Sequence, residues 1–240
     1  MIELLHQIEQ IDTQIFLFFN GFHNVYWDYF MMIFSDRFVW VPFYASFIFV
    51  LLKNFPVKVV MSTIVVITLI ILFSDQTASG ILKPLVARMR PSNPDNPISP
   101  MVHVVQGYRG GRYGFPSSHA ANAWSMAFFA QYLVRRSKLT IFLCLWALIT
   151  SYSRMYLGVH YFGDLLIGTL IGFLYATLYY YIFQYFLRKH TERFKPNHDI
   201  RFASVPIITG LVSIWVIICT SGIPVSYTHL RAHETCADLV

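Results

Sequence analysis

The stretch 59-VVMSTIVVITLIILFS-74 runs for sixteen residues without a charge. A helix that crosses a bilayer needs about 20 mostly apolar residues, so this stretch predicts a transmembrane helix that includes polar neighbours at its ends. Five more charge-free apolar stretches lie outward from it, at 38–52, 118–134, 139–153, 165–187 and 202–224. None of the six alternates in polarity as membrane strands do. The sequence therefore predicts an all-α, polytopic membrane bundle of about six transmembrane helices.

The composition favours the same class and excludes three others. Of the 240 residues, 56% are hydrophobic and only 12% are charged, whereas a soluble domain carries about 25% charged residues. A soluble enzyme is excluded, because too few charges are available to cover a water-facing surface. A disordered chain is excluded by the same values, because disordered chains combine low hydrophobicity with high charge. Three cysteines in a chain of this length exclude a disulfide-stapled secreted domain. No nucleic-acid partner is expected.

The chain divides into three segments. Residues 1–36 are expected to form an N-terminal interfacial or re-entrant helical segment, because polar residues interrupt the apolar run 15–34. The start of the chain lacks the basic region of a signal peptide, so no cleavage is expected. Residues 37–224 are expected to form the membrane-embedded domain.

The third segment, 225–240, is predicted to be foreign. Its first eleven residues, VSYTHLRAHET, resemble the translation of a transposase adapter used in preparing sequencing libraries. Such scars are excluded from reasoning about the fold. The natural C-terminus is then expected to differ from the one given.

The basic residues fall into two groups on opposite sides of the predicted membrane. One group occupies the short connections between helices, and the positive-inside rule makes that side cytoplasmic. The other group lies at the opposite helix ends, where basic residues run against the rule and anion binding would explain them. The first group is Lys53, Lys58, Arg135, Arg136, Lys138, Arg188, Lys189, Arg193, Lys195 and Arg201; the second is Lys83, Arg88, Arg90, Arg109, Arg112 and Arg154.

The second group accompanies two histidines, two serines and an aspartate on the same predicted face. Phosphate is bound by Arg forks, by a Lys charge and by hydroxyl or backbone N–H donors, and Ser117 and Ser118 begin a predicted helix. One histidine can attack phosphorus while the other protonates the leaving oxygen. Asp164 follows His160 by one helical turn, so it is suited to orient that imidazole.

Three motifs carry a family resemblance: K-x6-R-P from Lys83, P-S-x-H from Pro116, and S-R-x5-H-x3-D from Ser153. Together they resemble the type 2 phosphatidic acid phosphatase family, which shares its site with vanadium haloperoxidases and glucose-6-phosphatase-like enzymes. The resemblance spans roughly residues 75–185. It implies phosphate binding by Lys83, Arg90, Arg154, Ser117 and the backbone of Ser118, with His119 as general acid, His160 as nucleophile and Asp164 as the residue that orients it.

One residue departs from the family pattern, since Ser118 stands where the second motif usually has glycine. The backbone N–H survives that change, so we expect activity to survive. The family works without a metal, and outside the predicted foreign segment 225–240 no H-x-x-x-H or C-x-x-C spacing is found, so neither a metal nor a cofactor is expected.

The resemblance predicts a membrane lipid phosphatase with a phosphohistidine intermediate. Its active site would open at the extracytoplasmic face of a bacterial-type inner membrane. Undecaprenyl diphosphate, cleaved to the monophosphate, is the favoured substrate, and phosphatidate and phosphatidylglycerophosphate are alternatives. A lipid phosphotransferase, a vanadium haloperoxidase-like enzyme and a non-catalytic lipid transporter or scaffold are the rival classes.

Two features have no assigned role at this point. Arg88 lies inside the first motif without matching one of its fixed positions. The loop 92–115, which carries His103, Arg109 and Arg112, is rich in Gly and Pro and is expected to be solvated and mobile.

Overall fold

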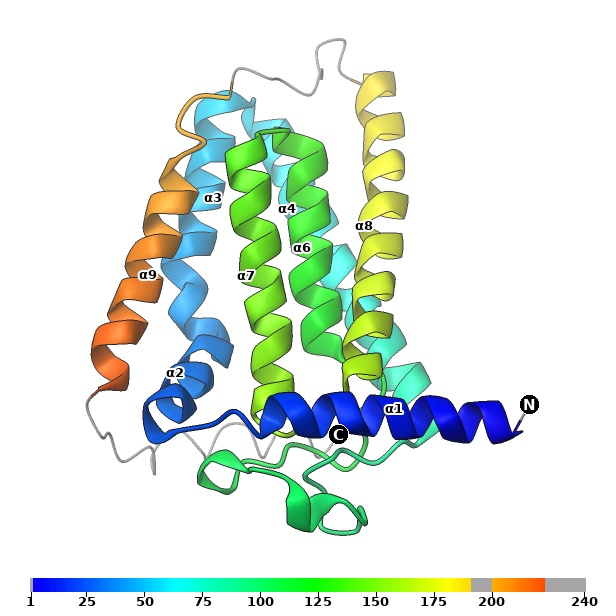
Figure 1. Cartoon of the computed structure of the whole chain (residues 1–240). Coiled ribbons are helices and arrows are strands. Elements are labelled where there is room, and N and C mark those ends of the chain that lie inside the picture. The colour runs from blue at the N-terminus through cyan, green and yellow to red at the C-terminus, as the bar shows by residue number, and fades with distance from the viewer. Residues whose placement is uncertain (1, 191–199, 223–240) are drawn as a thin grey trace.

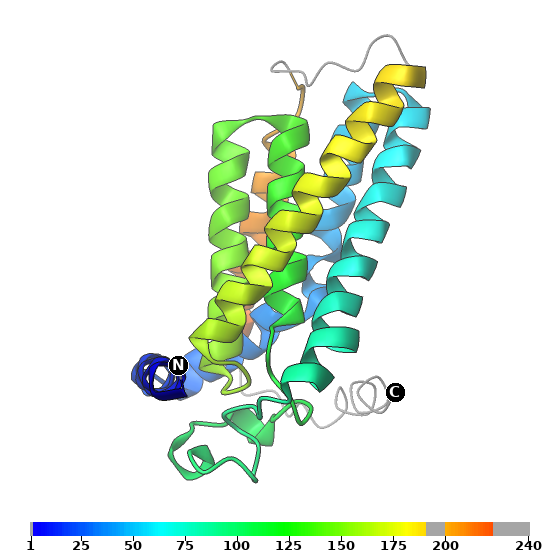
Figure 2. The same cartoon turned by 90° about the vertical axis from the view of Figure 1, so that its right-hand side faces the viewer.

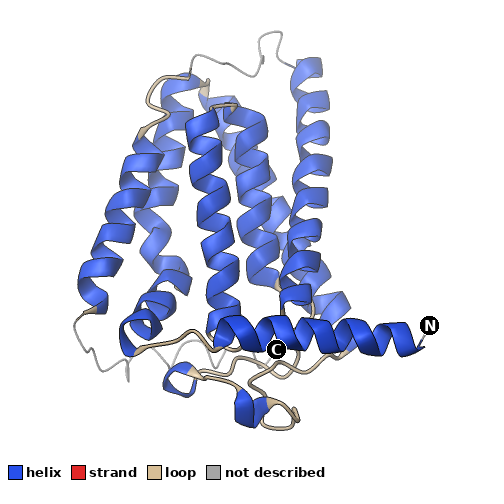
Figure 3. Cartoon of the chain, viewed as in Figure 1, coloured by secondary structure: helices blue, strands red, loops and turns tan. Residues whose placement is uncertain are grey.

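The computed structural model describes residues 2–190 and 200–222. Within them the regular elements are helices, joined by loops with one isolated bridge between Met89 and Tyr113, which confirms the all-α class (Figure 3). The predicted adapter segment 225–240 lies outside the described residues. The α-helices are α1 (Ile2–Asn20), α2 (Val25–Ser35), α3 (Val41–Asn54), α4 (Val57–Asp75), α5 (Lys83–Val86), α6 (Ser118–Val134), α7 (Ser137–Tyr156), α8 (Phe162–His190) and α9 (Val205–Ser221).

All six apolar stretches of the sequence form helices, namely α3, α4, α6, α7, α8 and α9. The count of six spans is not confirmed. In the described residues, three helices are long and apolar enough to cross a membrane: Val57–Val86, Ser137–Tyr156 and Phe162–Leu187. A fourth is added if α2 and the following Arg37–Asn54, which are bent by 65°, count as one span. Helix α9 is apolar but shorter.

Helix α6 explains part of this shortfall, because it lies inside the bundle between α7 and α8 (Figures 1 and 2). Its buried face carries five alanines and two serines beside the larger Phe129, Leu133 and Val134. Gly168 and Gly172 of α8 lie against the α6 backbone: a Cβ at Gly172 would stand 2.5 Å from the carbonyl oxygen of Ala121. Small residues permit such close approach between helices in membranes, so this contact fixes α6 against α8.

The connections between the helices lie at two opposite ends of the bundle. The α3–α4 and α6–α7 connections lie at the upper end in Figure 1, opposite α1 and the loop before α6. Asn54 and Arg201 exchange two hydrogen bonds at the upper end, with N···O distances of 2.7 and 2.8 Å. Within the described residues, the two predicted groups of basic residues thus lie at opposite ends of the bundle.

The N-terminal segment is built from α1 and α2. Helix α1 lies across the lower end of the bundle, and α2 turns up towards α3 (Figure 1). The two are joined at 21–24, where Asn24 caps α2 by accepting a hydrogen bond from the Trp27 backbone N–H at 3.0 Å. The interfacial placement of residues 1–36 in a bilayer stays a prediction.

Candidate active site

The three motifs come together at the lower end of the bundle, carried by the ends of four helices. Helix α4 continues through a π-helical turn, Gln76–Leu82, into α5, which begins with Lys83. Ser117 precedes α6, and Ser118 and His119 are its first two residues. The third motif spans the last turn of α7, the connection 157–161 and the first turn of α8.

Two arginines of these motifs are almost completely buried, which is unusual for a side chain that keeps its charge. Arg90 is 7% exposed, and its Nε donates to the carbonyl of Tyr113 at 3.0 Å. Arg154 is 3% exposed; it donates to the Ser35 hydroxyl through Nη1 and to the Tyr108 hydroxyl through Nη2 at 2.7 Å.

These contacts hold the Arg154 guanidinium in one orientation. Its Nε is buried and has no hydrogen-bond partner among the residues that the structure describes. A buried donor without a partner is costly, so an anionic ligand at this point would be stabilised. The sequence did not predict Ser35 or Tyr108 as neighbours of Arg154, because they lie 119 and 46 residues away along the chain.

Ser117 is both the cap of α6 and a link to α8. Its Oγ accepts from the Ala120 backbone N–H at 3.3 Å, and its backbone N–H donates to the carbonyl of Asp164 at 3.0 Å. The first N–H groups of a helix have no acceptor within the helix, so those of Ser118 and His119 are suited to bind an anion. Lys83, half-buried, donates to the Ser79 hydroxyl at 3.2 Å.

The buried histidine of the site is His160, which is 1% exposed. Its Nδ1 lies 3.3 Å from Oδ2 of Asp164, and the same oxygen accepts from the Tyr161 backbone N–H at 3.0 Å. Burial, followed by the charges of Arg90, Arg154 and Lys83, lowers the pKa of His160 well below its ordinary value. A neutral imidazole whose Nδ1 faces a carboxylate can present Nε2 as the nucleophilic nitrogen.

The other histidine, His119, is exposed. The positive charge of Arg154 lowers the pKa of His119 well below its ordinary value, and a bound phosphate would offset that charge. The structure therefore brings all eight predicted site residues to one end of the bundle, with one histidine buried and the other open to its surroundings.

Arg88 has a definite place at this site, although it matches no fixed position of the three motifs. Its Nη1 donates to Oδ2 of Asp12 at 2.7 Å and to Oδ1 of Asp164 at 3.0 Å. Burial lowers the pKa of Arg88, but the charges of Asp164 and Asp12 together raise it above its ordinary value. The available signal for Asp12 was a single carboxylate within the otherwise uncharged run 10–27.

The expectation of a solvated loop at 92–115 holds only in part: Arg109 and Arg112 are exposed, but other residues of the loop pack against the bundle. Ser92 is fully buried, and Asn93 and Asn96 are less than a tenth exposed. Side-chain amides replace water as partners of the loop backbone: Asn96 donates to the carbonyl of Arg90 at 3.0 Å. Arg109 donates to the carbonyl of Ser92, so its side chain also links two parts of the loop.

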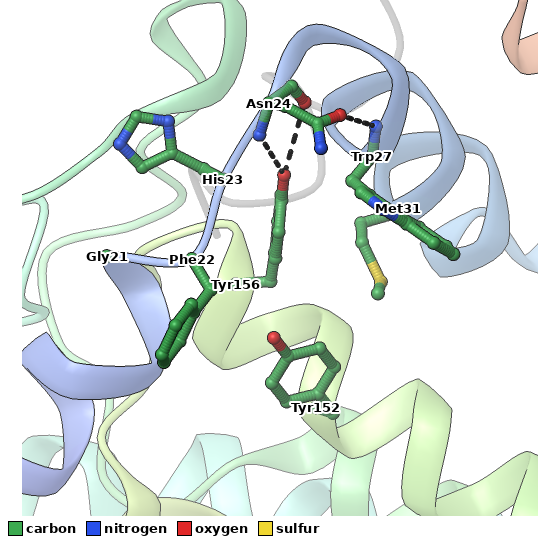
Figure 4. A pocket seen from close by; sticks show the side chains of 8 residues that line it. All are labelled: Gly21, Phe22, His23, Asn24, Trp27, Met31, Tyr152 and Tyr156. Atoms are coloured by element: carbon green, nitrogen blue, oxygen red, sulfur yellow. Dashed lines mark hydrogen bonds between the residues drawn. The ribbon is translucent and has the colours of Figure 1, made fainter.

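A separate cavity of about 550 Å³ lies beside the α1–α2 connection (Figure 4). It is lined by Gly21, Phe22, His23, Asn24, Trp27, Met31, Tyr152 and Tyr156, and none of the predicted site residues is among them. Within the described ranges, no group of three or more His, Cys, Asp or Glu side chains could hold a metal ion.

Comparison with known proteins agrees with this arrangement. The family model of the PAP2 superfamily matches residues 60–188, which include all three motifs. The chain belongs to the PAP2 superfamily. It is accordingly a PAP2-type membrane lipid phosphatase and a phosphoric monoester hydrolase.

Two curated relatives share a name. A lipid A 4′-phosphatase of Bacteroides thetaiotaomicron is 46% identical over 228 residues, which cover 92% of this chain and 98% of that protein. A lipid A 4′-phosphatase of Porphyromonas gingivalis is 32% identical over 182 residues, 75% of this chain and 76% of that protein. The crystal structure of Aquifex aeolicus LpxE matches with a TM-score of 0.53 and 22% identity, over 70% of this chain and 94% of that one. This last likeness concerns the fold.

Proposed function

We propose that this PAP2 phosphatase removes the 4′-phosphate from lipid A. The observation that carries the proposal is the 46% identity to a lipid A 4′-phosphatase over nearly the whole of both chains. A second relative of the same name supports it. The site contributes the phosphate chemistry, while its contacts give no information on the sugar or the acyl chains.

In the proposed mechanism, the cationic side chains Lys83, Arg90 and Arg154 bind the phosphate. The Ser117 hydroxyl and the N–H groups that begin α6 add neutral donors. Preorganised donors of this kind stabilise the charge that develops on phosphorus oxygens in the transition state. The burial of Arg90 and Arg154 supports this role, because their orientation is set before the substrate arrives.

The chemical step would proceed in two halves. Nε2 of His160 attacks phosphorus, the bond from phosphorus to the sugar oxygen breaks, and His119 gives its proton to that oxygen. A water molecule then attacks the phosphohistidine and loses its proton to His119. Inorganic phosphate and free His160 result. Asp164, 3.3 Å from Nδ1 of His160, would keep the imidazole in the reactive tautomer.

The active site is proposed to face the extracytoplasmic side of a bacterial-type inner membrane. The exposed cations Lys53, Lys58, Arg135 and Lys138 support this orientation, since they lie in connections opposite the site. The positive-inside rule assigns such connections to the cytoplasm. A cysteine introduced at Lys138 in intact cells would then be protected from a membrane-impermeant thiol reagent, with Cys144, Cys219 and Cys236 replaced first.

The sequence-based prediction of undecaprenyl diphosphate as the substrate, with phosphatidate and phosphatidylglycerophosphate as alternatives, competes with the proposal of lipid A. The test uses purified protein in detergent micelles, with lipid A and these three lipids in parallel. We expect inorganic phosphate from lipid A, with a product lighter by one phosphate at the 4′ position in mass spectrometry, and none with His160→Ala. Turnover of undecaprenyl diphosphate in preference to lipid A would overturn the proposed substrate.

The same assay separates the rival reactions. A phosphotransferase would pass the phosphoryl group to an added alcohol without releasing inorganic phosphate. A haloperoxidase-like enzyme loaded with vanadate would oxidise bromide in the presence of peroxide. Vanadate is expected to inhibit hydrolysis competitively as a mimic of pentacoordinate phosphorus. Chelators are expected to leave hydrolysis unchanged, and strong inhibition by EDTA would contradict the metal-free mechanism.

A further inference from the structure

Helix α1 makes contact with the active site through a single stripe of residues. Within 3–20, its buried residues are Asp12, Phe16 and Asn20, each four positions after the last, so they lie on one face. The remaining faces carry exposed apolar side chains such as Leu5, 58% exposed. On the buried face, Phe16 packs in an apolar cluster with Met155 and Tyr161, and Asp12 and Asn20 make polar contacts on either side of it.

Asp12 binds the turn that precedes the catalytic aspartate. Its Oδ1 accepts from the backbone N–H of Gly163 at 2.8 Å, and its Oδ2 accepts from Nη1 of Arg88 at 2.7 Å. Gly163 is the residue before Asp164. The Asp12 carboxylate therefore contacts both the backbone of Gly163 and the side chain of Arg88, which also binds Asp164.

Arg88 completes the connection to the reacting histidine. Its Nη1 reaches Oδ1 of Asp164 at 3.0 Å, while the other oxygen of Asp164 faces Nδ1 of His160. The guanidinium lies over the ring of Tyr161, 3.8 Å from its centroid. Arg88 is thus shared between two largely buried carboxylates, and the ring of Tyr161 limits how it can move.

The far end of the stripe is fastened to the end of α7. Nδ2 of Asn20 donates to the carbonyl of Tyr156 at 2.8 Å, and its Oδ1 accepts from the backbone N–H of His103 at 2.8 Å. Asn24 follows at the start of α2, where its backbone meets the Tyr156 hydroxyl at 3.4 Å (Figure 4). Helix α1 is therefore fixed at both ends of its buried stripe.

We propose that α1 is a strap that holds the catalytic aspartate in position, with Asp12 and Arg88 as positioning residues for hydrolysis. Arg88 fixes one oxygen of Asp164 so that the other stays directed at Nδ1 of His160. Asp12 in turn fixes Arg88 and the Gly163 backbone. This inference rests on the roles proposed above for His160 and Asp164, and it adds two residues that do not touch the phosphate.

The physical reason lies in the balance of charge. Asp12 and Asp164 are nearly excluded from water, and Arg88 is the cation that the structure places between them. Removing one partner of a buried ion pair leaves an uncompensated charge, which costs more than the pair contributes. Without Arg88 the two carboxylates repel each other, and Asp164 is released from the geometry that orients His160.

The test compares kcat and KM of purified variants on lipid A, dioctanoyl phosphatidate and p-nitrophenyl phosphate, together with vanadate affinity. We expect Arg88→Gln to lower kcat by about 100-fold and Asp12→Asn by about 10-fold, with KM and vanadate affinity within about 3-fold of wild type. Arg88→Lys should recover part of kcat, because it restores the charge without the fork. Asp95→Asn and Arg109→Gln are matched controls, since they remove a similar group outside this contact.

A double variant makes the test independent of simple loss of stability. In Arg88→Gln, the further change Asp12→Asn removes the repelling carboxylate, so it should raise kcat rather than lower it again. If the losses of kcat in the two single variants instead multiply in the double variant, as they do for independent sites, the proposal is overturned. Equal losses in the two controls would also overturn it. If wild type releases phosphate from the other substrates but not from lipid A, the proposed substrate fails while this comparison still decides the role of α1.

Discussion

The two ends of the bundle are both basic, yet the arginines of the candidate site are far more buried than most cations of the upper end. At the upper end, Lys53, Arg135 and Lys138 are exposed. At the lower end, Arg90 and Arg154 are less than a tenth exposed and are held by hydrogen bonds to neighbouring groups. Exposed cations can orient a protein in a membrane through their number alone. Buried cations with fixed geometry are what recognition of an anion requires.

The difference shows that charge in the sequence is a weak guide to function until burial is known. Burying an arginine is expensive unless partners or a ligand compensate for it. Arg154 has such partners in Ser35 and Tyr108, and its Nε is still without one in the described part of the chain. If the lower end is the reaction centre, changes there should affect catalysis far more than matched changes at the upper end.

The largest effect is expected for His160→Ala. Removing the proposed nucleophile should lower kcat by about 10⁴-fold or more, because no phosphohistidine can form. Acid-quenched wild-type enzyme should carry phosphate on histidine during turnover, and the variant should carry none. A variant with near wild-type activity would refute the mechanism and with it the contrast between the two ends.

A smaller loss is expected for Arg154→Gln. The change removes a preorganised charge from the phosphate site, so kcat/KM should fall by about 100-fold. Vanadate should bind more weakly as well, because vanadate uses the same cations. Measuring both quantities distinguishes loss of the anion site from loss of folded protein, which size-exclusion chromatography of the variant would reveal.

A more moderate effect is expected in the pH dependence of kcat/KM. Burial and the charges of Arg90, Arg154 and Lys83 lower the pKa of His160, so the imidazole stays neutral at pH values where an ordinary histidine, with a pKa of 6.5, is half protonated. The acidic limb of kcat/KM assigned to His160 should therefore lie below pH 6.5. Arg154→Gln removes one of these charges and should move the limb upward, while the titration of the substrate itself is common to both profiles. A limb that does not move would contradict the assignment.

The smallest effect is expected at the upper end. Arg135→Gln and Lys138→Gln should each change kcat/KM by less than about 2-fold, since both side chains are exposed and surface substitutions alter stability little. Assays in the same micelles as the Arg154→Gln variant make the comparison direct. A loss comparable to that of Arg154→Gln would mean that total charge, rather than the buried geometry, controls activity.

Much of the helical fold could be predicted from local composition. The six apolar stretches became helices with boundaries within a few residues of those expected, and α6 begins and ends at the predicted residues 118 and 134. The number of membrane spans could not be predicted in this way. Helix α6 is buried by its neighbours and carries small side chains where a lipid-facing helix would carry large apolar ones.

The sequence by itself determined which residues are candidates for the site, because no motif spans more than twelve residues. The pairing of His160 with Asp164 is such a local contact. Only the tertiary structure decided what holds these residues. Arg88 meets Asp12 across 76 positions, and Arg154 meets Ser35 across 119. Contacts of this length depend on how the helices pack, which no local spacing encodes.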